Sequence, residues 1–323
     1  MKKALKLGLV LFIFLIVGGT SAFWTPDTNR AEMITKYGGP NPTFIEDDKG
    51  LKIHVRDQGL RHGDVLILIH GGNSSLHVWE KMVKELSGDF RVISLDLPGH
   101  GLTGANQTGD YSPDAMADAI ETVMDNLDVE KAIWVGNSFG GWIAWRGALS
   151  RSDRVSGLVL VDASGAVTDD PIKPYLAARI AKSPLGKFLV PNFTPKPIVR
   201  ASLKQVMSND ENVTEAIVER NWELARFPGN RDAILDIQKL DRESDEWNKI
   251  QNINVPTLIL WGEDDVTMPL SFAKAFNRKI ENSVLIMHPN AAHVPMEEIP
   301  IALSQDIKAW YNSTYSKPSP NDE

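Results

Sequence analysis

The sequence predicts an α/β fold built on a mostly parallel, twisted eight-stranded sheet flanked by helices. Short apolar runs of strand length recur along the chain and alternate with stretches of helical periodicity. This alternation predicts strand–helix–strand units, in which the strands lie parallel. Several runs, such as VLILI at residues 65–69, are apolar throughout, which is typical of strands buried on both faces. Functional residues of such sheets are expected at the carboxyl ends of the strands.

The composition sets broad limits on function. The 323 residues are 42% hydrophobic and 24% charged, which suits an ordinary globular protein, and their net charge is −8. An acidic balance without a dense basic patch argues against a nucleic-acid partner. The chain has no cysteine, which excludes disulfides, thiolate metal sites and a cysteine nucleophile.

The N-terminus has the pattern of a secretory signal. Lys2, Lys3 and Lys6 precede an apolar run at residues 7–17, and small residues follow as far as Ala22. Two interpretations stay open for residues 1–22: a cleaved signal peptide, or a retained membrane anchor spanning residues 7–24. Both predict export, to the periplasm or the cell exterior or anchored to the inner membrane, and the second predicts membrane association.

The predicted elements follow in order after a Pro- and Gly-containing linker at residues 23–42. The first two strands are joined by a short turn at residues 47–50 and should form an antiparallel pair. Ser112 and Pro113 mark a helix start by their cap and first-position preferences. The remaining polar tail, residues 313–323, is expected to be disordered. The predicted strands cover residues 43–45, 51–56, 65–69, 91–95, 132–135, 155–161, 256–260 and 284–287, and the predicted helices residues 76–86, 112–127, 141–149, 271–279 and 300–311.

One segment interrupts the alternation. Residues 166–245 contain no clear buried strand, several prolines and two helix-like stretches at 213–227 and 231–240. We interpret this segment as a helical cap inserted over the strand ends. The core domain is then residues 43–165 together with 246–312. The alternative is that these helices simply form one side of the core.

The central motif is Gly136-Asn137-Ser138-Phe139-Gly140, which lies between a predicted strand and a predicted helix. A G-x-S-x-G sequence in this context predicts a nucleophile elbow, which projects the serine hydroxyl clear of the sheet. Gly136 and Gly140 lack a Cβ, so strand and helix can approach closely around the turn. The motif alone is also ordinary turn chemistry, and its catalytic interpretation depends on suitable partners elsewhere.

A base and a carboxylate are available after later strands. Of seven histidines, His293 lies in a loop a few residues past the last strand, where it can reach Ser138. Asp265 follows the strand at 256–260 and is our candidate for orienting the imidazole. Asp162, at the end of another strand, and Asp264 remain alternatives.

The oxyanion hole needs two N–H donors fixed in advance. Phe139 supplies one candidate, because its N–H opens the helix after Ser138. Gly72, in the glycine loop that follows the strand at residues 65–69, supplies the second.

These stretches together resemble the α/β-hydrolase fold superfamily, in its serine-nucleophile group of esterases and meta-cleavage hydrolases, across residues 43–312. The resemblance rests on HGGNSS, DLPGHGLTG, VGNSFGGWIAW, LVLVDASG, WGEDDVTMP and NAAHVPMEEIP. The order nucleophile, acid, base is that of the family. In its acid motif the aspartate stands four residues before a proline, which implies Asp265.

The resemblance implies a serine hydrolase that cleaves carboxylic esters through an acyl-enzyme, without cofactor or metal. Four apolar residues of the predicted cap are expected to line an acyl pocket: Ile180, Leu185, Phe188 and Leu189. Together with the predicted export, this favours small to medium lipophilic esters. Its partner would be a small-molecule ester. Because the elbow resembles that of the meta-cleavage C–C hydrolases, C–C hydrolysis is an alternative, although Val294 stands where those enzymes commonly carry Trp. A non-catalytic binding module on the same fold is a further alternative.

Overall fold

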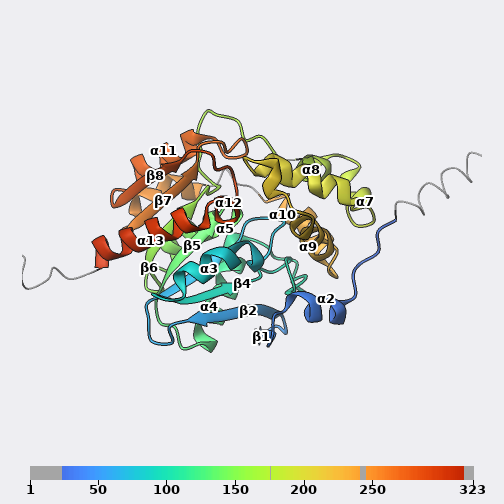
Figure 1. Ribbon diagram of the computed structural model, residues 1–323, viewed down its shortest axis with the longest axis horizontal. Helices are drawn as coiled ribbons and strands as arrows, with labels where there is room; N and C mark the ends of the chain where they lie inside the picture. The colour runs from blue at the N-terminus through green and yellow to red at the C-terminus, as the bar shows by residue number, and fades with distance from the viewer. Residues whose placement is uncertain (1–23, 175, 241–244, 316–323) are drawn as a thin grey trace, which may run out of the picture.

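The computed structural model describes residues 24–174, 176–240 and 245–315, and it contains a single eight-stranded sheet with helices on both faces (Figure 1). The strand order is β1-β2-β4-β3-β5-β6-β7-β8. The predicted fold class is confirmed. The strands are β1 (Thr43–Glu46), β2 (Lys52–Gly59), β3 (Val65–Ile69), β4 (Arg91–Leu95), β5 (Ala132–Asn137), β6 (Val155–Val161), β7 (Thr257–Gly262) and β8 (Ser283–His288).

The sheet is antiparallel at one end and parallel elsewhere. β1 pairs with β2, as the short turn predicts, and β2 also runs antiparallel to β4. All pairs from β4 through β3, β5, β6 and β7 to β8 are parallel. The carboxyl ends of β3, β5, β6, β7 and β8 therefore lie along one edge, and the loops that carry the candidate residues begin there.

Two apolar layers hold the helices against the sheet. The larger layer packs α4 (Pro113–Asn126), α5 (Phe139–Ser150) and α11 (Leu270–Lys279) on one face. The other packs the 3₁₀ turn η1 (Leu76–Trp79), α3 (Glu80–Leu86) and α13 (Pro300–Tyr315) on the opposite face. α4 begins as its sequence predicts, since the Ser112 hydroxyl accepts the N–H of Ala115 at 3.2 Å.

Helices also fill the segment between β6 and β7. They lie together beyond the carboxyl edge of the sheet (Figure 1), and α8 and α9 contact each other, as do α6 and α8. Arg220 of α9 pairs with Glu297 of the core at 2.5 Å, so these helices are tied to the core next to His293. These elements are α6 (Leu176–Lys182), α7 (Gly186–Leu189), α8 (Lys196–Val206), η2 (Asp210–Asn212), α9 (Glu215–Ala225) and α10 (Asn230–Ile237). The 3₁₀ helix η3 (Asp245–Asn252) also precedes β7, but it packs against α5 in the larger apolar layer.

The structure differs from the predicted elements at three places. Residues 23–42 are not simply a linker, because α2 (Arg30–Tyr37) forms there and the Asn29 side chain caps it by accepting the Glu32 N–H at 3.1 Å. The last helix continues to Tyr315, whose hydroxyl donates to the Ser156 carbonyl at 2.8 Å, so residues 313–315 are ordered. A short helix, α12 (Pro295–Glu298), follows His293 and was not predicted.

The predicted signal or anchor at residues 1–22 and the end of the predicted tail, residues 316–323, lie outside the described residues. Among the helices of residues 24–315 that the structure describes, none has the length and apolarity needed to cross a membrane.

Candidate active site

Ser138 occupies a sharp turn between β5 and α5. Its backbone angles are φ 52° and ψ −115°, an unfavourable conformation for a residue with a side chain. Several hydrogen bonds hold it there: its N–H donates to the Val161 carbonyl at 3.1 Å, and its carbonyl accepts the N–H and the hydroxyl of Ser164, both at 3.0 Å. The strain of the elbow is therefore maintained by the neighbouring strand β6.

Two glycines allow the close packing that this turn requires. A Cβ on Gly136 would lie 2.3 Å from the Gly140 carbonyl oxygen, and a Cβ on Gly140 would lie 2.3 Å from the Ile69 carbonyl oxygen. Both distances are too short for any side chain. The second contact also presses the elbow against the end of β3, where the glycine loop begins.

His293 and Asp265 form a buried pair. The Nδ1 atom of His293 lies 2.7 Å from Oδ2 of Asp265. The other carboxylate oxygen accepts the N–H groups of Thr267 at 2.7 Å and Met268 at 3.0 Å, which fixes the carboxylate. With Nδ1–H directed at Asp265, the Nε2 atom of His293 is left as the basic nitrogen.

The two alternative carboxylates are in different surroundings from Asp265. Asp264 is exposed. Asp162 is fully buried, and its Oδ1 accepts the Gly262 N–H at 2.9 Å. Burial, together with the adjacent charge of Asp265, raises the pKa of the Asp162 carboxyl well above its usual range. Asp162 thus lies next to the His293–Asp265 pair, in surroundings that favour its neutral form.

The glycine loop after β3 is braced by a neutral histidine. Nδ1 of His70 lies 2.7 Å from the Gly71 carbonyl, and its Nε2 accepts the Leu97 N–H at 3.0 Å. Burial lowers the pKa of His70, which agrees with this uncharged form. A Cβ on Gly72 would meet only the Phe139 Cβ, at 3.8 Å, so the two candidate oxyanion donors are neighbours.

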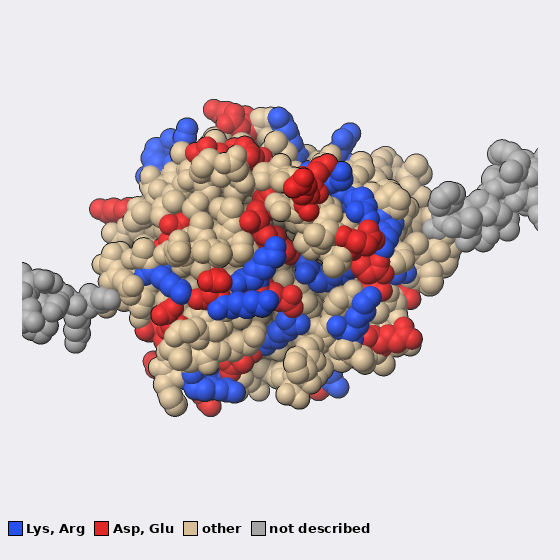
Figure 2. All heavy atoms as spheres, in the orientation of Figure 1, with Lys and Arg blue, Asp and Glu red and all other residues tan. Residues whose placement is uncertain are grey.

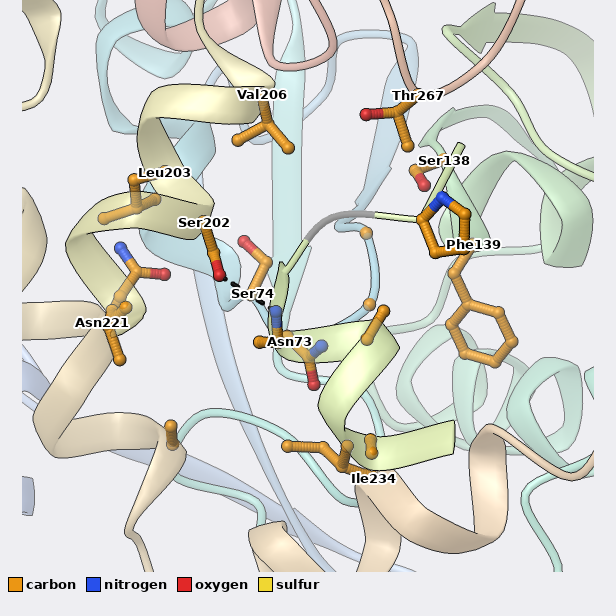
Figure 3. Close-up of a pocket in the computed structure, with 18 of the residues that line it drawn as sticks. Asn73, Ser74, Ser138, Phe139, Ser202, Leu203, Val206, Asn221, Ile234 and Thr267 are labelled. Carbon is orange, nitrogen blue, oxygen red and sulfur yellow. Dashed lines mark hydrogen bonds between the residues drawn. The ribbon is translucent and has the colours of Figure 1, made fainter. Parts of the chain in front are cut away.

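The candidate residues meet at a cavity of about 320 Å³. Ser138, His293, Gly72 and Phe139 all line it, whereas Asp265 lies behind His293. Figure 3 shows Ser138 and Thr267 on one side and Ser202, Leu203 and Val206 of α8 on the other. The cap side is mainly apolar and includes Ile180, Val199, Ile217 and Ile234. The prediction that Leu185 and Phe188 line the pocket is wrong, because both lie on the solvent-exposed side of α7. The site is therefore an apolar chamber between the strand ends and the inserted helices.

Two further residues belong to this site but carry no clear sequence signal. Asn137 donates from Nδ2 to the His293 carbonyl at 3.0 Å. His100 lines the cavity, and burial together with the nearby His70 lowers its pKa to about 3, so it is neutral. The asparagine lies inside the elbow motif, but its partner is distant in the sequence and could not be inferred from it.

Groups of three or more His, Cys, Asp or Glu side chains arranged to hold a metal ion do not occur among the described residues.

The alpha/beta hydrolase fold family model matches residues 64–300. The chain belongs to the α/β-hydrolase family. Among curated relatives of this α/β hydrolase is a pimeloyl-[acyl-carrier protein] methyl ester esterase of Vibrio atlanticus, 32% identical over 75% of this chain and 90% of the relative.

Solved structures of similar shape include two kinds of hydrolase. A meta-cleavage product hydrolase from Pseudomonas fluorescens is 27% identical with a TM-score of 0.72, covering 84% of this chain and 97% of that one. An esterase from Thermogutta terrifontis is 25% identical with a TM-score of 0.69, covering 85% of this chain and 100% of that one. The α/β hydrolase thus has both an esterase and a meta-cleavage product hydrolase among its structural neighbours.

Proposed function

We propose that this α/β hydrolase is a serine esterase that cleaves small to medium lipophilic carboxylic esters through an acyl-enzyme. The observation that carries the proposal is the combination of a strained Ser138 and a buried His293–Asp265 pair at one apolar cavity. An apolar chamber with few polar groups near the reacting centre suits a lipophilic acyl or alkyl group.

In the proposed reaction, Nε2 of His293 takes the proton of the Ser138 hydroxyl as Oγ attacks the ester carbonyl. The N–H groups of Gly72 and Phe139 stabilise the negative oxygen of the tetrahedral intermediate. The intermediate collapses with cleavage of the ester C–O bond, and the imidazolium gives its proton to the leaving alcohol. Water, activated by His293, then cleaves the acyl-enzyme and releases the acid. Asp265 stabilises the imidazolium in both steps.

The relatives support ester hydrolysis more than C–C cleavage. The curated relative at 32% identity is named as a methyl ester esterase. The C–C alternative draws its support from the structural neighbour at 27% identity, which is named as a meta-cleavage product hydrolase. Both reactions would use the same serine, so only activity measurements with both classes of substrate can distinguish them.

The first test is hydrolysis of p-nitrophenyl esters of increasing acyl length by the full chain and by Ser138→Ala. We expect turnover by the wild type, and a fall of about 10⁴-fold or more in kcat for Ser138→Ala, since the nucleophile is lost. Asp265→Asn should also lose most activity, whereas the adjacent exposed Asp264→Asn should retain it.

A different outcome would identify an alternative. A folded wild type that turns over dienoate C–C substrates but no ester would replace the esterase proposal with C–C hydrolysis. Inactivity on both panels would favour a binding module.

We also propose that the protein is exported, either to the periplasm or the cell exterior after cleavage of its N-terminal segment, or anchored to the inner membrane by that segment. The basic start and the apolar run of residues 7–17 support this. Fractionation of cells that express the full chain, with the mass of the isolated protein, tests both export and cleavage after Ala22.

A further inference from the structure

The cap carries an unusual surface beside the cavity mouth. Two large apolar side chains at α7 are strongly exposed, Leu185 at 65% and Phe188 at 67%. They are three residues apart in one helical turn, so they share a face. Single exposed apolar residues need no explanation, but a group of them marks an interaction site.

Exposed Trp24 belongs to the same end of the molecule. Its ring packs edge-on against Phe193 with centroids 6.1 Å apart, and 53% of it remains exposed. The next residue, Thr25, binds the same segment: its N–H donates to the Asn192 carbonyl at 3.0 Å, and its hydroxyl accepts the Thr194 N–H at 2.7 Å. The chain that follows the apolar N-terminal run is thus attached to the cap next to α7 (Figure 1).

The charge of this surface is opposite to that of the whole protein. The net charge is −8, yet every charged residue between Asp170 and Asp210 is basic. On α8, Lys196 pairs with Glu215 at 2.7 Å and Lys204 pairs with Asp210 at 2.5 Å. Lys173, Arg179 and Lys182 are exposed and have no ion pair with any described residue.

Part of this surface lies at the rim of the cavity. Ile172 and Lys182 are both exposed, and both line the cavity. Phe193, which contacts the Trp24 ring, lines the cavity as well. In Figure 2 the end of the molecule over α7 is largely free of acidic side chains on the face shown. The exposed apolar residues, the unpaired cations and the cavity mouth therefore occupy one region.

We propose that this region docks on the surface of an anionic lipid bilayer; it is formed by Trp24, Ile172, Lys173, Arg179, Lys182, Leu185 and Phe188. Leu185, Phe188 and Trp24 enter the boundary between headgroups and acyl chains, where aromatic residues are favoured. Lys173, Arg179 and Lys182 meet the anionic headgroups. The apolar run of residues 7–17 precedes Trp24 in the sequence. Contact of that run with a bilayer would therefore hold Trp24 and the adjacent face of the cap near the same bilayer. The cavity mouth then faces the bilayer, from which an amphipathic molecule can pass directly to the chamber.

The absence of cysteine from the sequence makes a direct test possible. Phe188→Cys in the full chain is labelled with a polarity-sensitive fluorophore and mixed with vesicles of phosphatidylcholine and phosphatidylglycerol in equal amounts. Ile301→Cys is the matched control, because Ile301 is 57% exposed but lies on α13. Iodide in the buffer reports whether each label is in water.

We expect the label at 188 to shift to the blue and to be protected from iodide about tenfold with anionic vesicles, while the label at 301 stays in water. Replacing Lys173, Arg179 and Lys182 together by Gln should weaken the insertion equilibrium about 100-fold, because each cation contributes about fivefold.

Three results would overturn the proposal. A label at 188 that stays as accessible as the label at 301 in vesicle-bound protein would mean that the N-terminal run alone holds the protein. Equal protection by pure phosphatidylcholine would exclude the anionic headgroup. Protection without vesicles would mean that a second copy of the chain covers the surface. The label reports position and not turnover, so these results are independent of the esterase proposal, which is checked on soluble p-nitrophenyl esters.

Discussion

The Nδ2 atom of Asn137 donates to the main-chain carbonyl of His293 at 3.0 Å and to that of Val161 at 3.1 Å. The side chain is almost fully buried and lies immediately before Ser138. It therefore connects the end of β5 to the loop that carries the candidate base and to the end of β6. We infer that this amide positions His293 relative to Ser138.

We predict that Asn137→Ala lowers kcat more than it changes KM. The variant removes the Nδ2 donor from the buried His293 carbonyl, which costs about 1–3 kcal/mol in the free energy of unfolding, while the Val161 carbonyl keeps the N–H of Ser138. A displacement of His293 of about 1 Å would lower kcat about 100-fold. Steady-state kinetics and urea unfolding measure the two effects, with Asn126→Ala as control because its exposed amide bonds only within its own helix. Reduced stability with unchanged kcat would contradict the positioning role.

The secondary structure could be predicted from the sequence where apolar runs and turn signals agree. Each of the eight strands was predicted, because runs such as residues 65–69 and 155–161 are buried on both faces and carry no competing helical pattern. Helix α2 was missed, since it buries only Met33 and is flanked by Pro and Gly residues that dominate the pattern. Its stability comes from the Asn29 cap and from contacts with distant residues.

The candidate site could be anticipated for a topological reason. Residues that directly follow parallel strands meet at one edge, so Ser138, Asp265 and His293 could be proposed from their places in the sequence. Contacts between a side chain and a distant part of the backbone could not be predicted in this way. Asn137 with His293 and Asp162 with Gly262 are such contacts, because their partners are separated by 156 and 100 residues.

A second His–Asp pair serves stability. Asp96 and His54 lie 2.7 Å apart, fully buried, and the same carboxylate accepts the N–H groups of Leu76 at 2.7 Å and Leu102 at 2.8 Å. Burial alone would raise the pKa of Asp96, but the hydrogen bond with His54 and the interactions with the other nearby histidines outweigh it and lower the pKa. Its contribution to stability is therefore present above the unfolded pKa of about 4 and is lost as the pH falls through the folded pKa.

We predict that Asp96→Asn lowers the free energy of unfolding by about 3 kcal/mol at neutral pH, since it breaks a buried pair. Urea unfolding from neutral to acid pH measures this, and the difference from the wild type should shrink as the pH falls. Asp89→Asn is the control: its pair with Lys308 is exposed and should contribute less than about 1 kcal/mol. Equal effects of the two substitutions would contradict the role of Asp96.

Asp162 should show the opposite pH dependence. Its pKa is raised in the folded protein, so its contribution to stability is present below the unfolded pKa of about 4 and is lost as the pH rises through the folded pKa. Asp162→Asn keeps a neutral donor at this position. We predict that the variant gains stability over the wild type as the pH rises above about 4, by up to about 1.4 kcal/mol per pH unit. Urea unfolding across pH measures the slope, and a constant difference would mean that Asp162 is ionised in the folded state.

Gly140 gives the sharpest steric test of the elbow. A Cβ at this position would lie 2.3 Å from the Ile69 carbonyl oxygen and 2.5 Å from that of His70, so α5 must move away from the end of β3. That movement separates Ser138 and Phe139 from the Gly72 loop. We predict that Gly140→Ala destabilises the protein by about 1–3 kcal/mol.

The same substitution should lower kcat about 100-fold in the protein that remains folded, because the nucleophile and the oxyanion donors lose their relative positions. Gly88→Ala is the matched control, since a Cβ there would have no atom within 4 Å. Thermal unfolding followed by steady-state ester hydrolysis at a temperature where both variants are folded separates stability from catalysis. Full activity of folded Gly140→Ala would show that the contact between α5 and β3 does not position the site.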